Sequence, residues 1–176
     1  MHEVFKMTSE ISVCIAQINY NSKSIGDHLN RIKRIIHRHR STDLIVFPEL
    51  ILQGHPSTEK PEGLLYRKAK ALYGDVSTKL YGFIRDEEAR VVFGQIRRKK
   101  DDLYNVATYA DANSVQHYVK THVHWTENFK PGKKLAAFDT PLGPLGINVC
   151  FDAAFPEVWR SIALKGPKLI LNISAV

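Results

Sequence analysis

The sequence predicts an α/β fold in which a mixed sheet, or two sheets, is covered by helices. Short, almost continuously apolar runs indicate strands that are buried on both faces. Longer segments between them carry apolar residues at helical spacing, with charged residues opposite. The chain of 176 residues, with 44% hydrophobic and 24% charged residues, suits one globular domain with a sizeable core. We therefore expect a single domain over residues 1–176.

Strands and helices alternate in the first half of the chain. We expect strands over residues 11–18 and 43–47, both buried on their two faces, and Pro48 ends the second. An amphipathic helix is expected between them over residues 24–40. Strand, helix and strand would then form a right-handed crossover unit. A second helical pattern follows over residues 62–89.

The second half of the chain is richer in strands. Residues 111–113 have the chemistry of a hairpin turn, and Pro156 fits the first turn of a helix that ends at Gly166. The expected strands cover residues 90–96, 103–110, 114–119, 135–140, 145–150 and 169–173. A buried strand at the end of the chain leaves its neighbours uncovered, so we expect that a longer domain has been cut short.

The formal net charge of +7 makes nucleic acid and anionic membranes partners to consider. The basic residues are spread along the chain, however, and the densest run, 97–100, is expected to be a solvated turn between strands. Neither a secretory signal nor an apolar run of membrane-spanning length is evident. We therefore expect a cytoplasmic protein that has neither a nucleic-acid nor a membrane partner.

Cofactor and metal sites have little support in the sequence. Cys14 and Cys150 lie in different apolar runs, so they predict neither a disulfide framework nor a metal pair. His122 and His124 place two imidazoles on one face of an expected strand, but a third ligand at useful spacing is missing. Phosphate-loop and dinucleotide motifs are also missing, so we expect no cofactor and no metal.

Cys150 lies where an apolar run ends and a helix is expected to begin. Near the positive end of a helix dipole the pKa of a thiol falls, which makes it a nucleophile. Glu49, after the strand 43–47, and Lys120, in 117–121, could supply a base and a cation. Each residue alone also has an ordinary reading, namely a small buried cysteine, a solvated loop carboxylate and a solvent-facing lysine.

Together these segments resemble the nitrilase, or carbon–nitrogen hydrolase, superfamily. The matching pieces are Phe47–Leu50, Tyr118–His122, Pro131–Gly132, Gly146–Asp152 and Phe155–Glu157, supported by Val92–Ile96, Leu103–Asn105 and 139–146. The resemblance covers residues 11–176 and implies a four-layer α-β-β-α sandwich. Relatives continue well past the position of Val176, so the C-terminal part of that domain is expected to be absent here.

The resemblance implies a hydrolase of non-peptide carbon–nitrogen bonds that works without a cofactor. Glu49 would be the general base, Lys120 the electrostatic stabiliser and Cys150 the nucleophile that forms a thioester. The backbone N–H of Phe151 would help to hold the oxyanion, and Glu127 is the best match for a second family glutamate that positions the substrate and the base. Asp152 is expected to hold the turn at Cys150, outside the reaction.

The substrate is less well defined than the reaction. A small amide is favoured over a nitrile, and a homodimer or larger homo-oligomer is expected, both by family resemblance. Trp125, His55 and Asn172 are candidates to line the substrate pocket. Two alternatives stay open, a catalytically inactive homologue that acts as a binding or interaction module and, more remotely, a basic nucleic-acid-binding domain.

Overall fold

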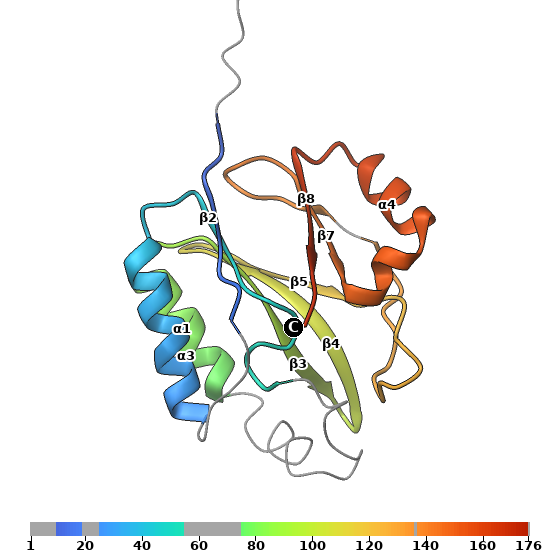
Figure 1. Ribbon diagram of the computed structural model, residues 1–176, viewed down its shortest axis with the longest axis horizontal. Helices are drawn as coiled ribbons and strands as arrows, with labels where there is room; N and C mark the ends of the chain where they lie inside the picture. Colours follow the sequence, from blue (N-terminus) through green and yellow to red (C-terminus); the bar gives the residue numbers. More distant parts are fainter. Residues whose placement is uncertain (1–9, 19–24, 55–74, 136, 176) are drawn as a thin grey trace, which may run out of the picture.

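The computed structural model describes residues 10–18, 25–54, 75–135 and 137–175. Their strands form two sheets that face each other, one with the order β1-β2-β3-β4-β5 and one with the order β6-β7-β8 (Figure 1). The first sheet contains β1 (Val13–Ile15), β2 (Leu44–Val46), β3 (Val91–Lys99), β4 (Asp102–Ala110) and β5 (Val115–Val119). The second contains β6 (Ala137–Phe138), β7 (Leu145–Val149) and β8 (Leu169–Ile173). The helices are α1 (Ile25–His39), α3 (Asp75–Asp86), the 3₁₀ helix η2 (Cys150–Ala154) and α4 (Pro156–Ala163).

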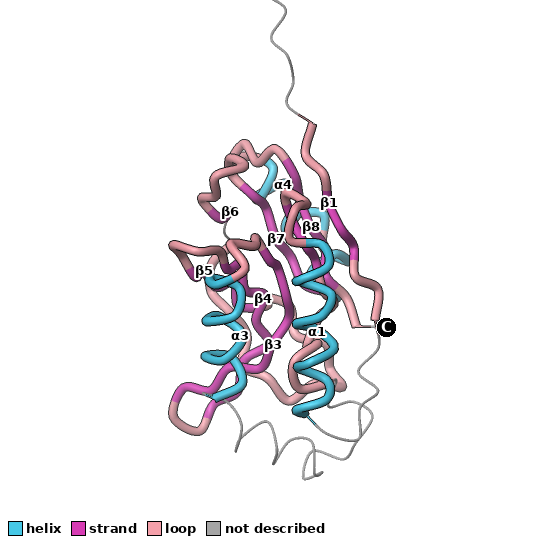
Figure 2. Tube along the Cα trace, turned by 90° about the vertical axis from the view of Figure 1, so that its left-hand side faces the viewer, coloured by secondary structure: helices cyan, strands magenta, loops and turns pink. Residues whose placement is uncertain are grey.

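Helices cover the outer face of each sheet, which makes four layers. In Figure 2, α1 and α3 lie side by side across one face of the first sheet, and their apolar sides pack on Ile45 and Phe93. A second apolar cluster, which includes Val92, Tyr109 and Ile147, fills the space between the sheets. On the far side α4 packs on β7. The predicted α-β-β-α sandwich is therefore confirmed.

The first sheet is mixed, as predicted. β1, β2 and β3 are parallel neighbours, whereas β3, β4 and β5 run antiparallel. The expected hairpin of β4 and β5 is confirmed, and the Asp111 carboxylate holds its turn by accepting hydrogen bonds from the N–H groups of Asn113 and Ser114. The predicted helix at 24–40 and strand at 169–173 are also confirmed, as α1 and β8.

Three expectations about the strands were wrong. The apolar run 11–18 forms only a short strand, in which Ile15 is 77% exposed, because β1 lies at the edge of its sheet. β8 is also an edge strand and is largely half-buried for the same reason. The basic run 97–100 is mostly strand, since β3 continues to Lys99 and Lys100 turns the chain with a φ of 57°. Edge position depends on tertiary pairing, which an apolar run does not encode.

Two expected helices differ from the structure in their bounds. The expected helix 62–89 is seen from Asp75 onward as α3, and its first part, 62–74, lies outside the described residues, as does His55. The helix at Pro156 begins as predicted but ends at Ala163, three residues before Gly166. Among the described helices, none has both the length and the apolar character needed to cross a bilayer.

Candidate active site

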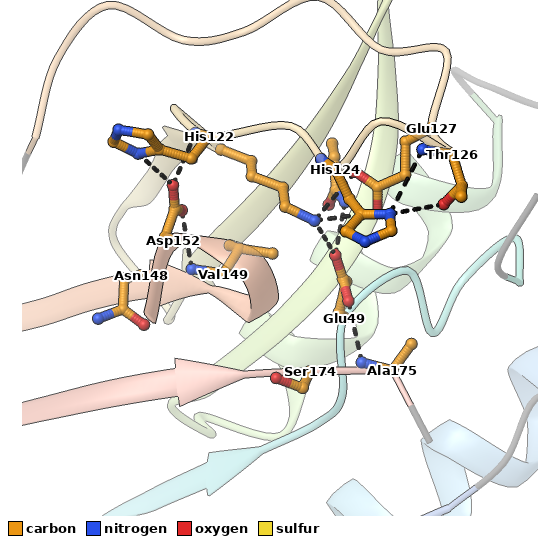
Figure 3. Close-up of polar contacts among 12 residues, drawn as sticks. Glu49, His122, His124, Thr126, Glu127, Asn148, Val149, Asp152, Ser174 and Ala175 are labelled. Carbon is orange, nitrogen blue, oxygen red and sulfur yellow. Dashed lines mark hydrogen bonds and ion pairs between the residues drawn. The ribbon is translucent and has the colours of Figure 1, made fainter. Parts of the chain in front are cut away.

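A buried cluster of one lysine and two glutamates lies at one end of the sandwich. Lys120 follows β5, Glu49 follows β2, and Glu127 comes from the loop after β5. Figure 3 shows Glu49 and Glu127 at this site. The Lys120 Nζ lies 2.9 Å from Glu49 Oε1 and 2.9 and 3.0 Å from the two Glu127 oxygens. The three side chains are 0%, 0% and 1% exposed, respectively. Segments after β2 and β5 thus bring three charged side chains to one site that is shielded from solvent.

The charges in this cluster determine the protonation of Lys120. Burial alone would lower the pKa of this ammonium group, but the adjacent charges of Glu49 and Glu127 outweigh burial and raise it. Lys120 therefore stays cationic at neutral pH. Removing either partner from such a buried arrangement would leave a charge without compensation, which is strongly destabilising.

Two further groups hold the Glu49 carboxylate from other directions. The Asn105 side-chain amide on β4 donates to Glu49 Oε1 at 2.7 Å, and the Ala175 N–H donates to Oε2 at 2.9 Å. Asn105 is 1% exposed and was not among the predicted site residues. A lone amide within an apolar strand was the signal that could have revealed it. These contacts orient one oxygen to Lys120 and hold the other by the main chain after β8.

Glycine on the neighbouring strand allows Glu49 to take this position. A Cβ atom added at Gly94 would lie 2.2 Å from Leu50 N and 2.5 Å from Glu49 Cα. No real Cβ atom makes such contacts with backbone, so β3 can approach the Glu49 turn only through a glycine.

The chain reverses direction sharply at Cys150, between β7 and η2. Cys150 has a φ of 46°, in the left-handed region that non-glycine residues rarely adopt. Such backbone is held only where surrounding contacts impose it, and it is concentrated at functional sites. The turn presents the thiol near the Glu49 carboxylate, whose negative charge acts on it.

Asp152 fixes this turn to the segment that carries Lys120. One carboxylate oxygen accepts hydrogen bonds from the Val149 N–H at 3.0 Å and the Tyr118 hydroxyl at 2.9 Å. The other accepts from the His122 N–H at 2.8 Å and the Thr121 hydroxyl at 2.9 Å. Asp152 is fully buried, and its expected role in holding the turn is confirmed.

The expected fall in the pKa of the Cys150 thiol is wrong. Burial and then the Glu49 charge raise it, and the Lys120 ammonium offsets only part of the effect. The helix after Cys150 is a short 3₁₀ helix of five residues, which provides a weak dipole. The resting thiol is therefore protonated, and the Glu49 carboxylate near it could accept its proton.

The other predicted site residues lie at different distances from the turn. Trp125 is 81% exposed. Its ring meets the ring of Phe151, the residue that follows Cys150, edge-on with 5.8 Å between the ring centroids. Asn172 instead hydrogen-bonds Asn148 and Ser174.

The two histidines after Lys120 do not form a pair. β5 has already ended at Val119, so they do not share a strand face as expected. The His122 ring stacks on Phe155 at 3.9 Å, whereas the His124 Nδ1 lies 2.7 Å from the Thr126 hydroxyl. In the part of the chain that the structure describes, no group of three His, Cys, Asp or Glu side chains is placed to hold a metal.

The sequence is similar to a known protein family along most of its length. The carbon–nitrogen hydrolase family model matches residues 12–176. A probable nitrilase of Schizosaccharomyces pombe is 28% identical over 89% of this chain and 58% of its own length. A 2-oxoglutaramate amidase of Paenarthrobacter nicotinovorans is 27% identical over 96% of this chain and 62% of its own length.

Solved structures of the same family share this fold. The crystal structure of a carbon–nitrogen hydrolase from Helicobacter pylori superposes with a TM-score of 0.83 at 21% identity, over 94% of this chain and 60% of that one. The chain thus spans about three fifths of the length of the proteins it matches. Because the family model covers residues 12–176 and these relatives match most of the chain, the chain belongs to the carbon–nitrogen hydrolase family of the nitrilase superfamily.

Proposed function

We propose that this protein hydrolyses the carbon–nitrogen bond of a small amide, with Cys150 as nucleophile, Glu49 as general base and Lys120 as electrostatic stabiliser. The observation that carries the proposal is the buried contact of Lys120 Nζ with Glu49 at 2.9 Å, near the sharp turn that carries Cys150. Burying a lysine with two glutamates costs free energy. Apolar residues of similar size at these three positions would stabilise the fold at least as well. Such buried charged groups are typical of catalytic sites.

The first half of the reaction forms a thioester. Glu49 takes the proton from the Cys150 sulfur, and the thiolate attacks the amide carbon, so that a carbon–sulfur bond forms and the carbonyl electron pair moves to oxygen. The Lys120 ammonium and the Phe151 N–H would stabilise this oxyanion, each donor by about 3 kcal/mol. As the oxyanion collapses, the carbon–nitrogen bond breaks and Glu49 returns its proton to the leaving nitrogen.

The second half of the reaction regenerates the thiol. Glu49 takes a proton from a water molecule, which attacks the thioester carbon. The carbon–sulfur bond then breaks, and the proton passes from Glu49 to the Cys150 sulfur. The products are a carboxylic acid and ammonia, or an amine, and the site returns to its starting charge.

Glu127 would act on the substrate and on Lys120. Both of its oxygens lie within 3.0 Å of the ammonium group, opposite Glu49. This bidentate contact restrains the Lys120 side chain, whose ammonium group also donates to Glu49. The placement supports Glu127 as the second glutamate of the family site.

The preference for an amide, and the assembly, rest on the relatives. The 2-oxoglutaramate amidase named above carries an amide in its name, whereas the other relative is a probable nitrilase. A homodimer or larger homo-oligomer is proposed by family resemblance and is measurable by light scattering.

The test is ammonia release from a panel of small amides and nitriles. We expect at least one amide to react faster than its matched nitrile, and Cys150→Ala to remove the activity. Lys120→Met should also remove it, measured at a temperature where circular dichroism shows that the variant is folded, because the loss of a buried partner is destabilising. Cys14→Ala is the matched cysteine control and should retain it. Folded protein that releases no ammonia from any member of the panel would favour the inactive binding module instead.

A further inference from the structure

A basic groove lies on the first sheet, on the face opposite the Lys120 cluster. Its volume is about 830 Å³, within the range of small-molecule sites. Five of its lining residues are cationic, and none of the lining residues that the structure describes is acidic. The cationic residues are Arg97, Arg98, Lys99, Lys133 and Lys134. Because side chains alternate along β3, Arg97 and Lys99 share the face of the groove, whereas the Arg98 side chain points to the other face.

The pleat of the sheet separates the groove from the candidate active site. Side chains alternate along a strand, so Lys120 points to the space between the sheets and Val119 to the outer face. Val106 is paired with Val119 and Tyr104 with Arg97, which makes one continuous outer surface. This surface is the apolar and aromatic floor of the groove.

Lys133 and Lys134 form a basic wall, and hydrogen bonding holds this wall beside the floor of the groove. The Gly132 N–H donates to the Lys120 carbonyl at 2.8 Å, so residues 131–134 run along β5. A Cβ atom on Gly132 would lie 2.3 Å from the Val119 carbonyl oxygen, which shows how closely the two segments approach. Lys133 and Lys134, both exposed, are thereby held beside Val119.

A relay of hydrogen bonds sets the donor that His117 offers. The Ser77 hydroxyl donates to Gln95 Oε1 at 2.6 Å, so the Gln95 amide nitrogen donates to the Thr108 hydroxyl at 2.6 Å. Thr108 then donates to His117 Nδ1 at 3.0 Å, which leaves the proton on Nε2. Burial, and then the charge of Arg97, lower the pKa of His117 to about 4, so this neutral form persists at physiological pH.

We propose that this groove binds a phosphorylated small molecule with an aromatic or apolar group. The basic wall would hold the phosphates, the His117 Nε2–H would donate a hydrogen bond, and Tyr104 with Val119 would contact the ring. A cationic wall beside an aromatic floor suits both parts of such a ligand. The proposal does not depend on the hydrolase function, because none of these side chains contacts Glu49 or Cys150 in the described structure.

The experiment is calorimetric titration of the whole chain with ATP, tripolyphosphate and adenosine at low salt. ATP should bind more tightly than tripolyphosphate, and adenosine most weakly. The double variant Lys133→Gln/Lys134→Gln should weaken ATP binding about tenfold, since an exposed charge contact contributes up to about fivefold. The matched control, Lys165→Gln/Lys168→Gln, also removes two exposed lysines and should leave the dissociation constant unchanged.

Three results would overturn the proposal. They are absence of binding up to millimolar ATP, equal weakening in both double variants, and tighter binding of a short single-stranded RNA than of ATP. The last would reassign the groove to nucleic acid. Thermal unfolding of all variants in parallel confirms that a loss of binding comes from the groove and not from the fold.

Discussion

Replacing Asp152 by asparagine tests whether the turn at Cys150 and the Lys120 segment are held as one unit. The substitution keeps the size of the side chain but exchanges one acceptor oxygen for an NH₂ group. The contacts with the Val149 N–H, the Tyr118 hydroxyl and the His122 N–H come from two different segments. Whichever way the amide is oriented, its NH₂ group faces at least one N–H donor.

The magnitude follows from these contacts. A buried donor left without an acceptor costs about 1–3 kcal/mol, and hydrogen bonds to a charged group contribute about 1.5–3 kcal/mol. We expect Asp152→Asn to lower the free energy of unfolding by about 3 kcal/mol. For a domain of this size that corresponds to a fall in Tm of roughly 6–12 °C.

The assay combines urea unfolding with amide hydrolysis. In urea the midpoint should fall with an unchanged slope, and kcat should fall at least about tenfold at a temperature where the variant is folded, because a small misplacement of reacting groups is costly. Asp139→Asn is the control, since Asp139 is exposed and contacts Gln116 only through its main chain. An Asp152→Asn protein whose unfolding free energy lies within about 0.5 kcal/mol of the parent would refute the reasoning.

Two further predictions concern the thiol and the glycines. Because Glu49 raises the pKa of Cys150 and Lys120 lowers it, the pH midpoint of iodoacetamide alkylation should move down in Glu49→Gln and up in Lys120→Met; peptide mass spectrometry checks this, and the opposite order would contradict it. Gly94→Ala should destabilise the protein by at least about 3 kcal/mol, because its Cβ would lie 2.2 Å from backbone. Gly82→Ala has open space within α3 and should stabilise it by about 0.5–1 kcal/mol, so equal effects in denaturant would count against the close-approach argument.

Local patterns in the sequence were enough to predict much of the fold. The periodic apolar residues of α1 and the proline that begins α4 identify those helices without tertiary information. The position of a strand within its sheet is different, because β1 and β8 are as apolar as central strands and yet lie at the edges of the sheets that the described strands form. Pairing partners decide that position, and they are distant in the sequence.

The candidate site shows the same division. Motif order pointed to Glu49, Lys120 and Cys150 because each lies just after a strand, where loops converge. Asn105 was missed as a site residue because its role is to orient Glu49, a contact across 56 positions of sequence. The direction of the Cys150 pKa shift also depended on tertiary burial, which no local dipole argument contains.

The most direct test of the central claim is capture of the thioester. An amide that the protein hydrolyses is mixed with it, the reaction is quenched in acid, and the peptide that contains Cys150 is weighed by mass spectrometry. We expect an adduct equal to the substrate minus ammonia on that peptide, and none in Cys150→Ala, which should also be inactive. Turnover that persists in Cys150→Ala, or an acyl group found on another residue, would contradict it.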